Sequence, residues 1–181
     1  MKRCSRCVLP ETYPGIQYDA QGVCNFCHSH RERATFGREA LDKRVDEQRC
    51  RTGRYDSIVA LSGGRDSSYV AYYATIELGL EPLLYTFDNG MMPEQTVENV
   101  QQTARLLGLD HVMEKSDAVG KNARHILSCW VHKPSPAMVG LICNGCRTGY
   151  VRGLARTARR HQIGLVLTGG GEPTESFAER L

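Results

Sequence analysis

Long apolar runs are absent from this chain of 181 residues, and no stretch approaches the roughly 18 consecutive apolar residues of a membrane span. No apolar run follows Met1-Lys2-Arg3-Cys4, so we expect no secretory signal, no membrane partner and a cytoplasmic location. A large excess of one charge is also missing. The net charge of +3 neither requires nor excludes a nucleic-acid partner. With 41% hydrophobic and 24% charged residues, the composition excludes a disordered chain and is typical of a globular protein.

Cysteine, by contrast, is abundant, with eight residues. Without export, these side chains are expected to be thiols or metal ligands rather than disulfides. Cys4-x2-Cys7 is followed by Cys24-x2-Cys27 at the spacing of a tetrahedral zinc site with four cysteine ligands. This segment has few apolar residues, so bound Zn²⁺ would supply folding free energy that the segment otherwise lacks. His28 and His30 lie nearby, but four thiolates already saturate a structural site.

Composition divides the chain into three segments. Residues 1–30 form the predicted zinc-binding segment, and 31–54 are charge-rich, which indicates a solvated helix or linker. From 55 to 181, apolar runs at 55–61, 82–87, 111–114 and 163–167 alternate with helical patterns at 67–78, 93–107, 118–130 and 147–162. This alternation predicts an α/β fold with a doubly wound parallel sheet.

The turn Ser62-Gly63-Gly64-Arg65-Asp66-Ser67-Ser68 lies between the first predicted strand and the first predicted helix. Two glycines allow close backbone approach, and the following helix offers free N–H groups and a positive dipole end, which together suit a phosphate anion. The spacing is neither a Walker loop nor GxGxxG. An ordinary strand-to-helix turn with a serine cap is the competing interpretation. Asp66 would repel phosphate, so it would hold Mg²⁺ or order the loop.

Cys143-Asn144-Gly145-Cys146 is a third CxxC sequence, and it lacks a matching pair of its own. We place it at a loop-to-helix transition, where the helix N-terminus would favour thiolates and the pair would approach the cleft beside the phosphate-binding turn. Three interpretations stay open: ligands of a second metal or iron–sulfur cluster, a redox or persulfide-carrying pair, and a structural turn.

The helical pattern that follows is rich in arginine. Arg147, Arg152, Arg156, Arg159 and Arg160 form either a solvated face or a surface for phosphates. Trp130 and the three tyrosines at positions 69, 72 and 73 are expected to be core residues.

Several motifs carry a resemblance to a known family. SGGRDS after an apolar strand resembles the signature of the PP-loop ATP pyrophosphatases, which have an adenine nucleotide alpha-hydrolase-like (HUP) fold. Members bind ATP, adenylate an acceptor oxygen and release pyrophosphate before a nitrogen or sulfur nucleophile displaces AMP. With MKRCSRCVLPET…GVCNFC, PLLYTFDNG and ICNGCRTG, the order of motifs is most similar to the N-acetyl sugar amidotransferases. These convert an acetamido to an acetamidino group with ammonia from a separate glutaminase.

The resemblance implies a set of ligand-binding residues. It places ATP on Ser62, Gly63, Gly64, Arg65, Asp66, Ser67 and Ser68, with Phe87, Asp88, Gly169, Gly170 and Glu172 completing the site. Asp66, Cys143 and Cys146 would serve the reaction. Arg65 could instead be merely solvated. Asp88 could meet the ribose or a metal, or could simply form a turn at the strand end.

The implied function is ATP-dependent activation of a carbonyl or amide followed by nitrogen transfer, with a sugar nucleotide as acceptor and Mg²⁺ and Zn²⁺ as metals. A sulfur transferase, acting on tRNA or a small molecule and served by a sulfur-donor protein, is the first alternative. A non-catalytic nucleotide-binding zinc subunit is the second. The chain departs from the family by ending at Leu181, without the usual C-terminal extension, and no cysteine follows Cys146. The oligomeric state stays open.

Overall fold

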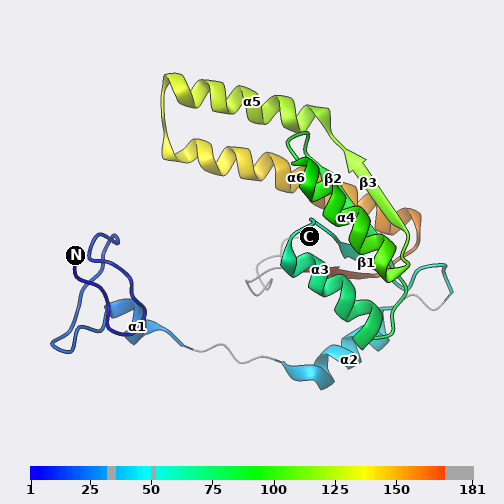
Figure 1. Cartoon of the computed structure of the whole chain (residues 1–181), viewed down its shortest axis with the longest axis horizontal. Coiled ribbons are helices and arrows are strands. Elements are labelled where there is room, and N and C mark those ends of the chain that lie inside the picture. The colour runs from blue at the N-terminus through cyan, green and yellow to red at the C-terminus, as the bar shows by residue number, and fades with distance from the viewer. Residues whose placement is uncertain (32–35, 50–51, 170–181) are drawn as a thin grey trace. The chain divides into compact units, whose positions relative to one another are not determined.

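The computed structural model describes residues 1–31, 36–49 and 52–169; inside one helix it leaves out the side chains of Pro136, Ala137, Val139, Ile142 and Cys143. Its internal contacts divide the chain into two units, Met1–Glu39 and Ala40–Leu181. Figure 1 shows the elements of both.

The first unit has little regular structure. It contains one short helix, α1 (Asn25–Ser29), and two isolated antiparallel bridges, Arg3 with Pro10 and Tyr18 with Cys24. The buried hydrophobic side chains in its described part are Cys4 and Cys24. Helix α2 (Gly37–Gln48) follows and reaches into the second unit, where Val45 is buried. The first unit is therefore organised around cysteine sulfur rather than around aliphatic side chains.

A parallel sheet of four strands forms the centre of the second unit. The strands are β1 (Ser57–Ala60), β2 (Pro82–Asp88), β3 (His111–Lys115) and β4 (Leu165–Thr168), in the order β3-β2-β1-β4. All four residues of β1 are buried. The chain leaves β1 toward β2 on one side and returns to β4 on the other, so the predicted doubly wound sheet is confirmed.

Helices cover both faces of this sheet. On one face, α3 (Arg65–Tyr72), the π-helical turn Tyr73–Glu77 and α4 (Glu94–Leu107) pack with α2. On the other face, α6 (Pro136–Arg160) packs beside α5 (Asp117–His132). Val59 and Leu61 point to the first face and Ile58 and Ala60 to the second, which is the two-residue period of a strand.

Helix α6 begins well before the position that the sequence suggested. The expected helix at 147–162 starts instead at Pro136, because proline suits the first turn of a helix. Cys143 and Cys146 therefore lie in the helix interior, and the prediction of a loop-to-helix transition there is wrong. Gly140 and Gly145 are helical residues as well. Neither Cys143 nor Cys146 lies in the first turn of the helix, where the helix dipole acts.

Two glycines of α6 let this helix lie directly on β2. A Cβ atom at Gly149 would lie 2.6 Å from Cζ of Phe87, and one at Gly153 would lie 2.1 Å from the hydroxyl oxygen of Tyr85. Real Cβ atoms do not approach other atoms so closely. The two aromatic side chains of β2 thus occupy the space that a larger residue in α6 would fill.

The aromatic residues expected in the core are partly at the surface. Tyr69 and Tyr72 are exposed and stack on one another, with ring centroids 6.2 Å apart, and Trp130 is also exposed. The expectation that these three belong to the core is therefore wrong. Their apolar neighbours in sequence suggested burial, but α3 and α5 turn these positions away from the sheet.

Replacement of Gly153 by alanine should lower the free energy of unfolding by about 1–3 kcal/mol, because the new methyl group collides with Tyr85. Gly140→Ala in the same helix is the matched control, since a Cβ there meets nothing within 4 Å. This control should be neutral or slightly stabilising. Urea unfolding of both variants measures the difference, and equal midpoints would contradict the close approach.

Candidate nucleotide and zinc sites

A cavity of about 310 Å³ lies at the carboxyl ends of the strands in the second unit. Its wall includes Ser62 and Ser67 from the loop after β1, Phe87 from β2, and Gly169 after β4. Helix α6 contributes Cys146 and Tyr150. The strands that follow β1 in the sequence lie on both sides of it in the sheet, so the strand order reverses at β1. The cavity lies at this reversal, which is where α/β sheets bind ligands.

The loop between β1 and α3 is held by one buried hydroxyl group. Ser67 Oγ accepts hydrogen bonds from the Ser62 N–H (3.1 Å) and donates its proton to the Gly64 carbonyl (3.1 Å). The Ser62 hydroxyl lies 2.9 Å from Ser67 Oγ and must be the donor of that pair, because the Ser67 proton is already committed. Ser67 therefore fixes the loop, while Ser62 is exposed at the cavity wall.

The two glycines of the loop have different roles. Gly63 has φ +76°, and a Cβ there would lie 2.8 Å from the Thr96 carbonyl oxygen of α4, so packing on α4 requires this glycine. Gly64 has an extended backbone, and a Cβ there would meet only the Ser62 hydroxyl at 3.5 Å. The open side of the loop is thus at Gly64, next to a hydroxyl of the cavity wall.

The first turn of α3 presents polar groups beside this cavity. The side chains of Arg65 and Asp66 are 96% and 77% exposed, with Arg65 Nε 3.8 Å from Asp66 Oδ1. Ser68 is half-buried, and its N–H bonds the Gly64 carbonyl as in a helix. A Cβ at Gly169 would lie 3.0 Å from the Asp66 carbonyl and the Ser67 nitrogen, so the end of β4 touches this turn. Gly170 and Glu172 lie outside the described residues.

The Asp88-Asn89-Gly90 sequence forms a tight turn after β2. Asp88 Oδ1 accepts the Gly90 N–H at 2.8 Å, and Asn89 Oδ1 accepts the Met91 N–H at 3.0 Å. These bonds match the turn interpretation of Asp88. They also fix the amide of Asn89, whose NH₂ group donates to Cys146 Sγ at 3.4 Å. Asn89 is a site neighbour that the sequence analysis did not select, although its position in the DNG turn was visible.

Of the cysteine side chains that the structure describes, only that of Cys146 lines this cavity. The backbone of Cys143 lies one helical turn earlier in α6, and its side chain is outside the described set. Cys129 lies on α5, with Sγ 3.8 Å from His125 Nε2, and is not part of the cavity wall. Of the expected pair, the described side chains thus bring Cys146 to this cavity.

A polar cluster supports the cavity wall beneath α6. The buried Tyr85 hydroxyl donates to Glu114 Oε2 at 3.2 Å, and Arg156 Nη2 pairs with the other oxygen of that carboxylate. Burial and the negative charge of Glu114 raise the pKa of Tyr85, so its hydroxyl keeps its proton. Arg156 therefore forms an ion pair that connects α6 to β3. The sequence predicted this arginine to lie on a solvated face or on a surface for phosphates.

In the first unit, the sulfur atoms of Cys4, Cys7, Cys24 and Cys27 all lie within 4.8 Å of one another. Cys7 and Cys24 are 3.5 Å apart and Cys4 and Cys27 3.8 Å apart. A tetrahedron of four Zn–S bonds of about 2.3 Å has edges of about 3.8 Å, so this donor set fits Zn²⁺. His28 instead lies 2.7 Å from Asp19, consistent with its prediction as a bystander.

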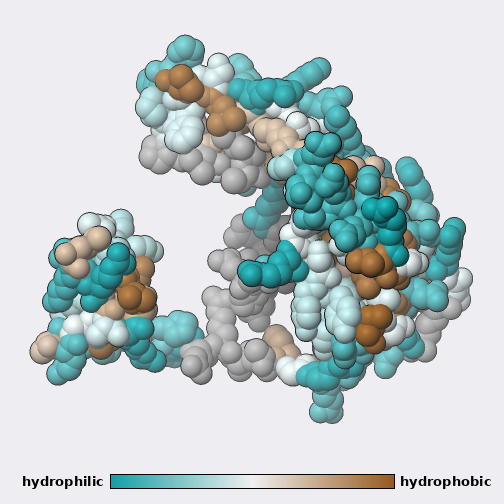
Figure 2. Space-filling view, viewed as in Figure 1, coloured by the Kyte–Doolittle hydropathy of each residue, from teal (hydrophilic) through white to brown (hydrophobic). Residues whose placement is uncertain are grey.

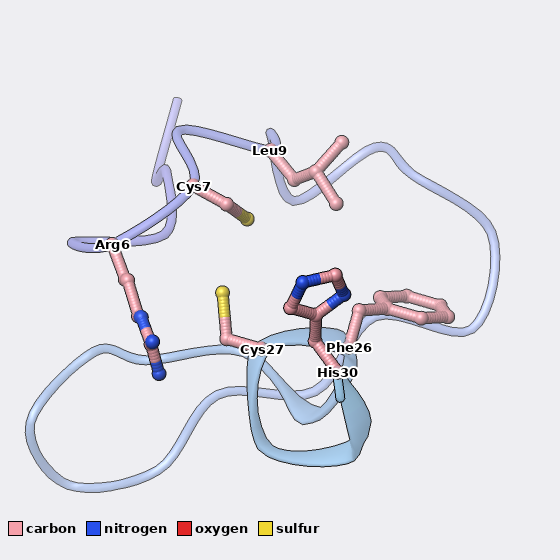
Figure 3. Close-up of a pocket in the computed structure, with 6 residues that line it drawn as sticks. All are labelled: Arg6, Cys7, Leu9, Phe26, Cys27 and His30. Carbon is pink, nitrogen blue, oxygen red and sulfur yellow. The ribbon is translucent and has the colours of Figure 1, made fainter. Parts of the chain in front are cut away.

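The backbone prepares one of these thiols for metal binding. Burial raises the pKa of Cys4, but the N–H groups of Cys7, Arg6 and Cys24 donate to its sulfur and lower the pKa to about 6. Burial and the neighbouring thiols raise the pKa of Cys27 to about 12. A bound cation would displace the proton of Cys27 and favour its thiolate. Figure 3 shows Cys7 and Cys27 among the residues that line a cavity of about 380 Å³.

Comparison with known proteins identifies the fold. No protein family and no curated protein matches the chain. Among solved structures, the NH₃-dependent NAD synthetase from Campylobacter jejuni has a TM-score of 0.51 at 14% identity, covering 73% of this chain and 52% of that one. The glutamine-dependent NAD⁺ synthetase from Acinetobacter baumannii, solved with ADP, has a TM-score of 0.52 at 16% identity, covering 82% and 29%.

The chain thus spans about half or less of these two structures. It has the α/β fold of the NAD synthetases, in agreement with the adenine nucleotide alpha-hydrolase-like architecture expected from the sequence. At such low identity the likeness establishes the fold alone.

Gly64→Val should weaken ATP binding at least tenfold while leaving unfolding unchanged, because the added side chain points into open space at the loop. Gly63→Ala should instead destabilise the fold through its collision with Thr96. Gly140→Val is the matched glycine-to-valine control. Calorimetric ATP titration and thermal unfolding separate these effects, and undiminished ATP affinity in Gly64→Val would show that the loop is only a turn.

Replacing Cys4 and Cys24 together by serine should remove about one zinc per chain, since two ligands of the proposed tetrahedron disappear. Cys129→Ser is the control and should keep its zinc, because Cys129 lies on α5. Elemental analysis of purified protein gives the ratio. Full zinc content in the double variant would refute the assignment.

Proposed function

We propose that this chain uses ATP to activate a carbonyl or amide oxygen of an acceptor and that a nitrogen nucleophile then displaces AMP. The observation that carries the proposal is the cavity at the carboxyl ends of the strands, which joins the Ser62–Ser67 loop to Cys146 and Tyr150 of α6. The NAD synthetase fold supports a nucleotide at this place. One solved structure with this fold contains ADP, and one is described as NH₃-dependent.

The residues of the loop suit the polyphosphate. The N–H groups of the first turn of α3 are donors beside the cavity, and Gly64 leaves room for phosphate oxygens. Phe87 and Tyr150 supply apolar surface for the adenosine. In the first step the acceptor oxygen bonds to the α-phosphorus and pyrophosphate leaves. In the second, nitrogen bonds to the activated carbon and AMP leaves with the oxygen.

Asp66 is the residue we assign to Mg²⁺. Its exposed carboxylate at the start of α3 is the type of oxygen ligand that Mg²⁺ binds, with water and phosphate oxygens completing the sphere. Mg²⁺ would neutralise phosphate charge. Asp88 is less suited to this role, because one of its oxygens already accepts the Gly90 N–H.

The acceptor and the donor rest on the motif resemblance. We propose a sugar nucleotide as acceptor and a separate glutaminase as the source of ammonia. One structural neighbour is described as glutamine-dependent, which supports such a source. The zinc-binding unit is then a structural accessory. A tRNA acceptor is less favoured.

Cys146 favours a second candidate, which is sulfur transfer after the same adenylation. Its sulfur lines the cavity in which the activated carbon would form, and the amide of Asn89 donates to it. An iron–sulfur cluster would need further thiol ligands, and among the described side chains Cys146 stands alone at this cavity.

Cys146→Ser should leave ATP affinity and the melting temperature nearly unchanged but lower turnover at least tenfold, because the residue faces the cavity rather than the core. Pyrophosphate release from ATP is measured with candidate acceptors in the presence of ammonium or sulfide. Ammonium dependence supports nitrogen transfer and sulfide dependence supports sulfur transfer. ATP binding without pyrophosphate release under any condition would indicate a non-catalytic nucleotide-binding subunit.

Gly140→Ala serves as the control for the same helix. Wild-type turnover in Cys146→Ser, or unfolding of that variant, would refute a role for this thiol in the reaction.

A further inference from the structure

The free end of the α5–α6 pair is apolar, although it is far from the core. Leu127, Trp130 and Val131 of α5 and Leu141 of α6 are all exposed, with Val131 81% and Leu141 55% exposed. In Figure 2, brown hydrophobic surface is visible at this end, which reaches beyond the sheet in Figure 1. In sequence, α6 begins with seven residues that carry no polar side chain, 136–142. We call this end, residues 127–142, the hairpin tip.

The charged residues of the same helical pair are nearly all positive. Residues 117–160 contain eight lysines and arginines but a single acid, Asp117, whereas the whole chain has a net charge of only +3. At and beside the tip, Arg124 and Lys133 are exposed, and neither forms an ion pair with another described residue. Lys121, nearer the start of α5, is exposed as well. The apolar tip is thus flanked by exposed basic side chains without an ion-pair partner among the described residues. We call these basic residues the collar.

We propose that the hairpin tip attaches the protein to the surface of an anionic lipid membrane, which departs from the expectation of no membrane partner that the lack of long apolar runs suggested. Apolar side chains at the tip would enter the boundary between headgroups and acyl chains, and the collar would contact anionic headgroups. Trp130 suits that boundary because its indole is mostly apolar with one N–H donor. None of the described helices is long and apolar enough to cross a membrane, so this attachment is interfacial.

Charge argues against the other occupants of this surface. A second copy would bring two positive collars together, which opposes association through the tip. A nucleic-acid backbone would satisfy the collar but would leave Val131 and Leu141 in water. A lipid surface meets both requirements, because it offers negative charge next to an apolar layer.

The single tryptophan of the chain makes the proposal directly measurable. The zinc-loaded full chain is mixed with vesicles of phosphatidylcholine alone or with about 30% phosphatidylglycerol, which supplies the negative surface charge. Trp130 emission should shift to the blue, and the protein should float with the phosphatidylglycerol vesicles. Affinity for phosphatidylcholine alone should be at least tenfold lower.

Variants separate the apolar and charged contributions. Val131→Asp with Leu141→Asp should abolish flotation, whereas Leu106→Asp, at an equally exposed leucine on α4, should not change it. Arg124→Gln and Lys133→Gln should each weaken binding about fivefold. Gly64→Val tests independence from the proposed enzyme function and should float normally.

Three results would overturn the proposal. The first is an unchanged emission spectrum with both kinds of vesicle. The second is equal flotation of the tip variant and the wild type. The third is a blue shift that depends on protein concentration without lipid, which would indicate a second copy at the tip instead.

Discussion

The arrangement of the cavity depends on the contact of α6 with β2 through glycine. Tyr85 and Phe87 of β2 fill the positions of missing side chains at Gly153 and Gly149, and Arg156 pairs with Glu114 next to them. This contact sets the distance between helix and sheet. At that distance Cys146 and Tyr150, on the same helix, complete a cavity whose other wall is the loop after β1. Every chemical role proposed for α6 therefore rests on how closely a backbone can approach an aromatic ring.

The loop after β1 shows a similar division between support and function. Ser67 and Gly63 face the protein, one through hydrogen bonds and the other through packing on α4, while Ser62 and Gly64 face outward. A motif of small residues can thus contain both supporting residues and residues open to a ligand, and the two look alike in sequence. Only the packing around each residue distinguishes them.

Local patterns in the sequence were sufficient for most of the fold. Strand alternation, proline near the start of α4 and the left-handed Gly108 after it are short-range signals, and they gave these elements nearly at their observed bounds. The cysteine spacing likewise indicated the four-sulfur cluster. Contacts between residues far apart in the chain could not be predicted from local patterns. The pairing of Arg156 with Glu114, and the bond from Asn89 to Cys146, join residues that only the folded sheet brings together.

Where sequence reasoning failed on an element, a glycine was involved. The expected helix at 147–162 left out Gly140 and Gly145, yet both are helical residues of α6. At Gly145 the neighbouring α5 is close, with Asn122 3.4 Å from the Cβ position, whereas a Cβ at Gly140 would meet nothing within 4 Å. Gly149 and Gly153 show that a glycine in this chain can mark close contact between elements as well as a turn.

The continuity of α6 has a mechanical consequence. The helix runs without a break from Pro136 at the hairpin tip past Cys146 to Arg160. At a rise of about 1.5 Å per residue, its first turn lies about 15 Å from the thiol at the cavity wall. Gly149 and Gly153 form the contact on which the helix rests, so the hairpin tip, the thiol of Cys146 and the contact with β2 all belong to one continuous helix. A ligand held at the tip would therefore be joined to the cavity wall through a single element of structure.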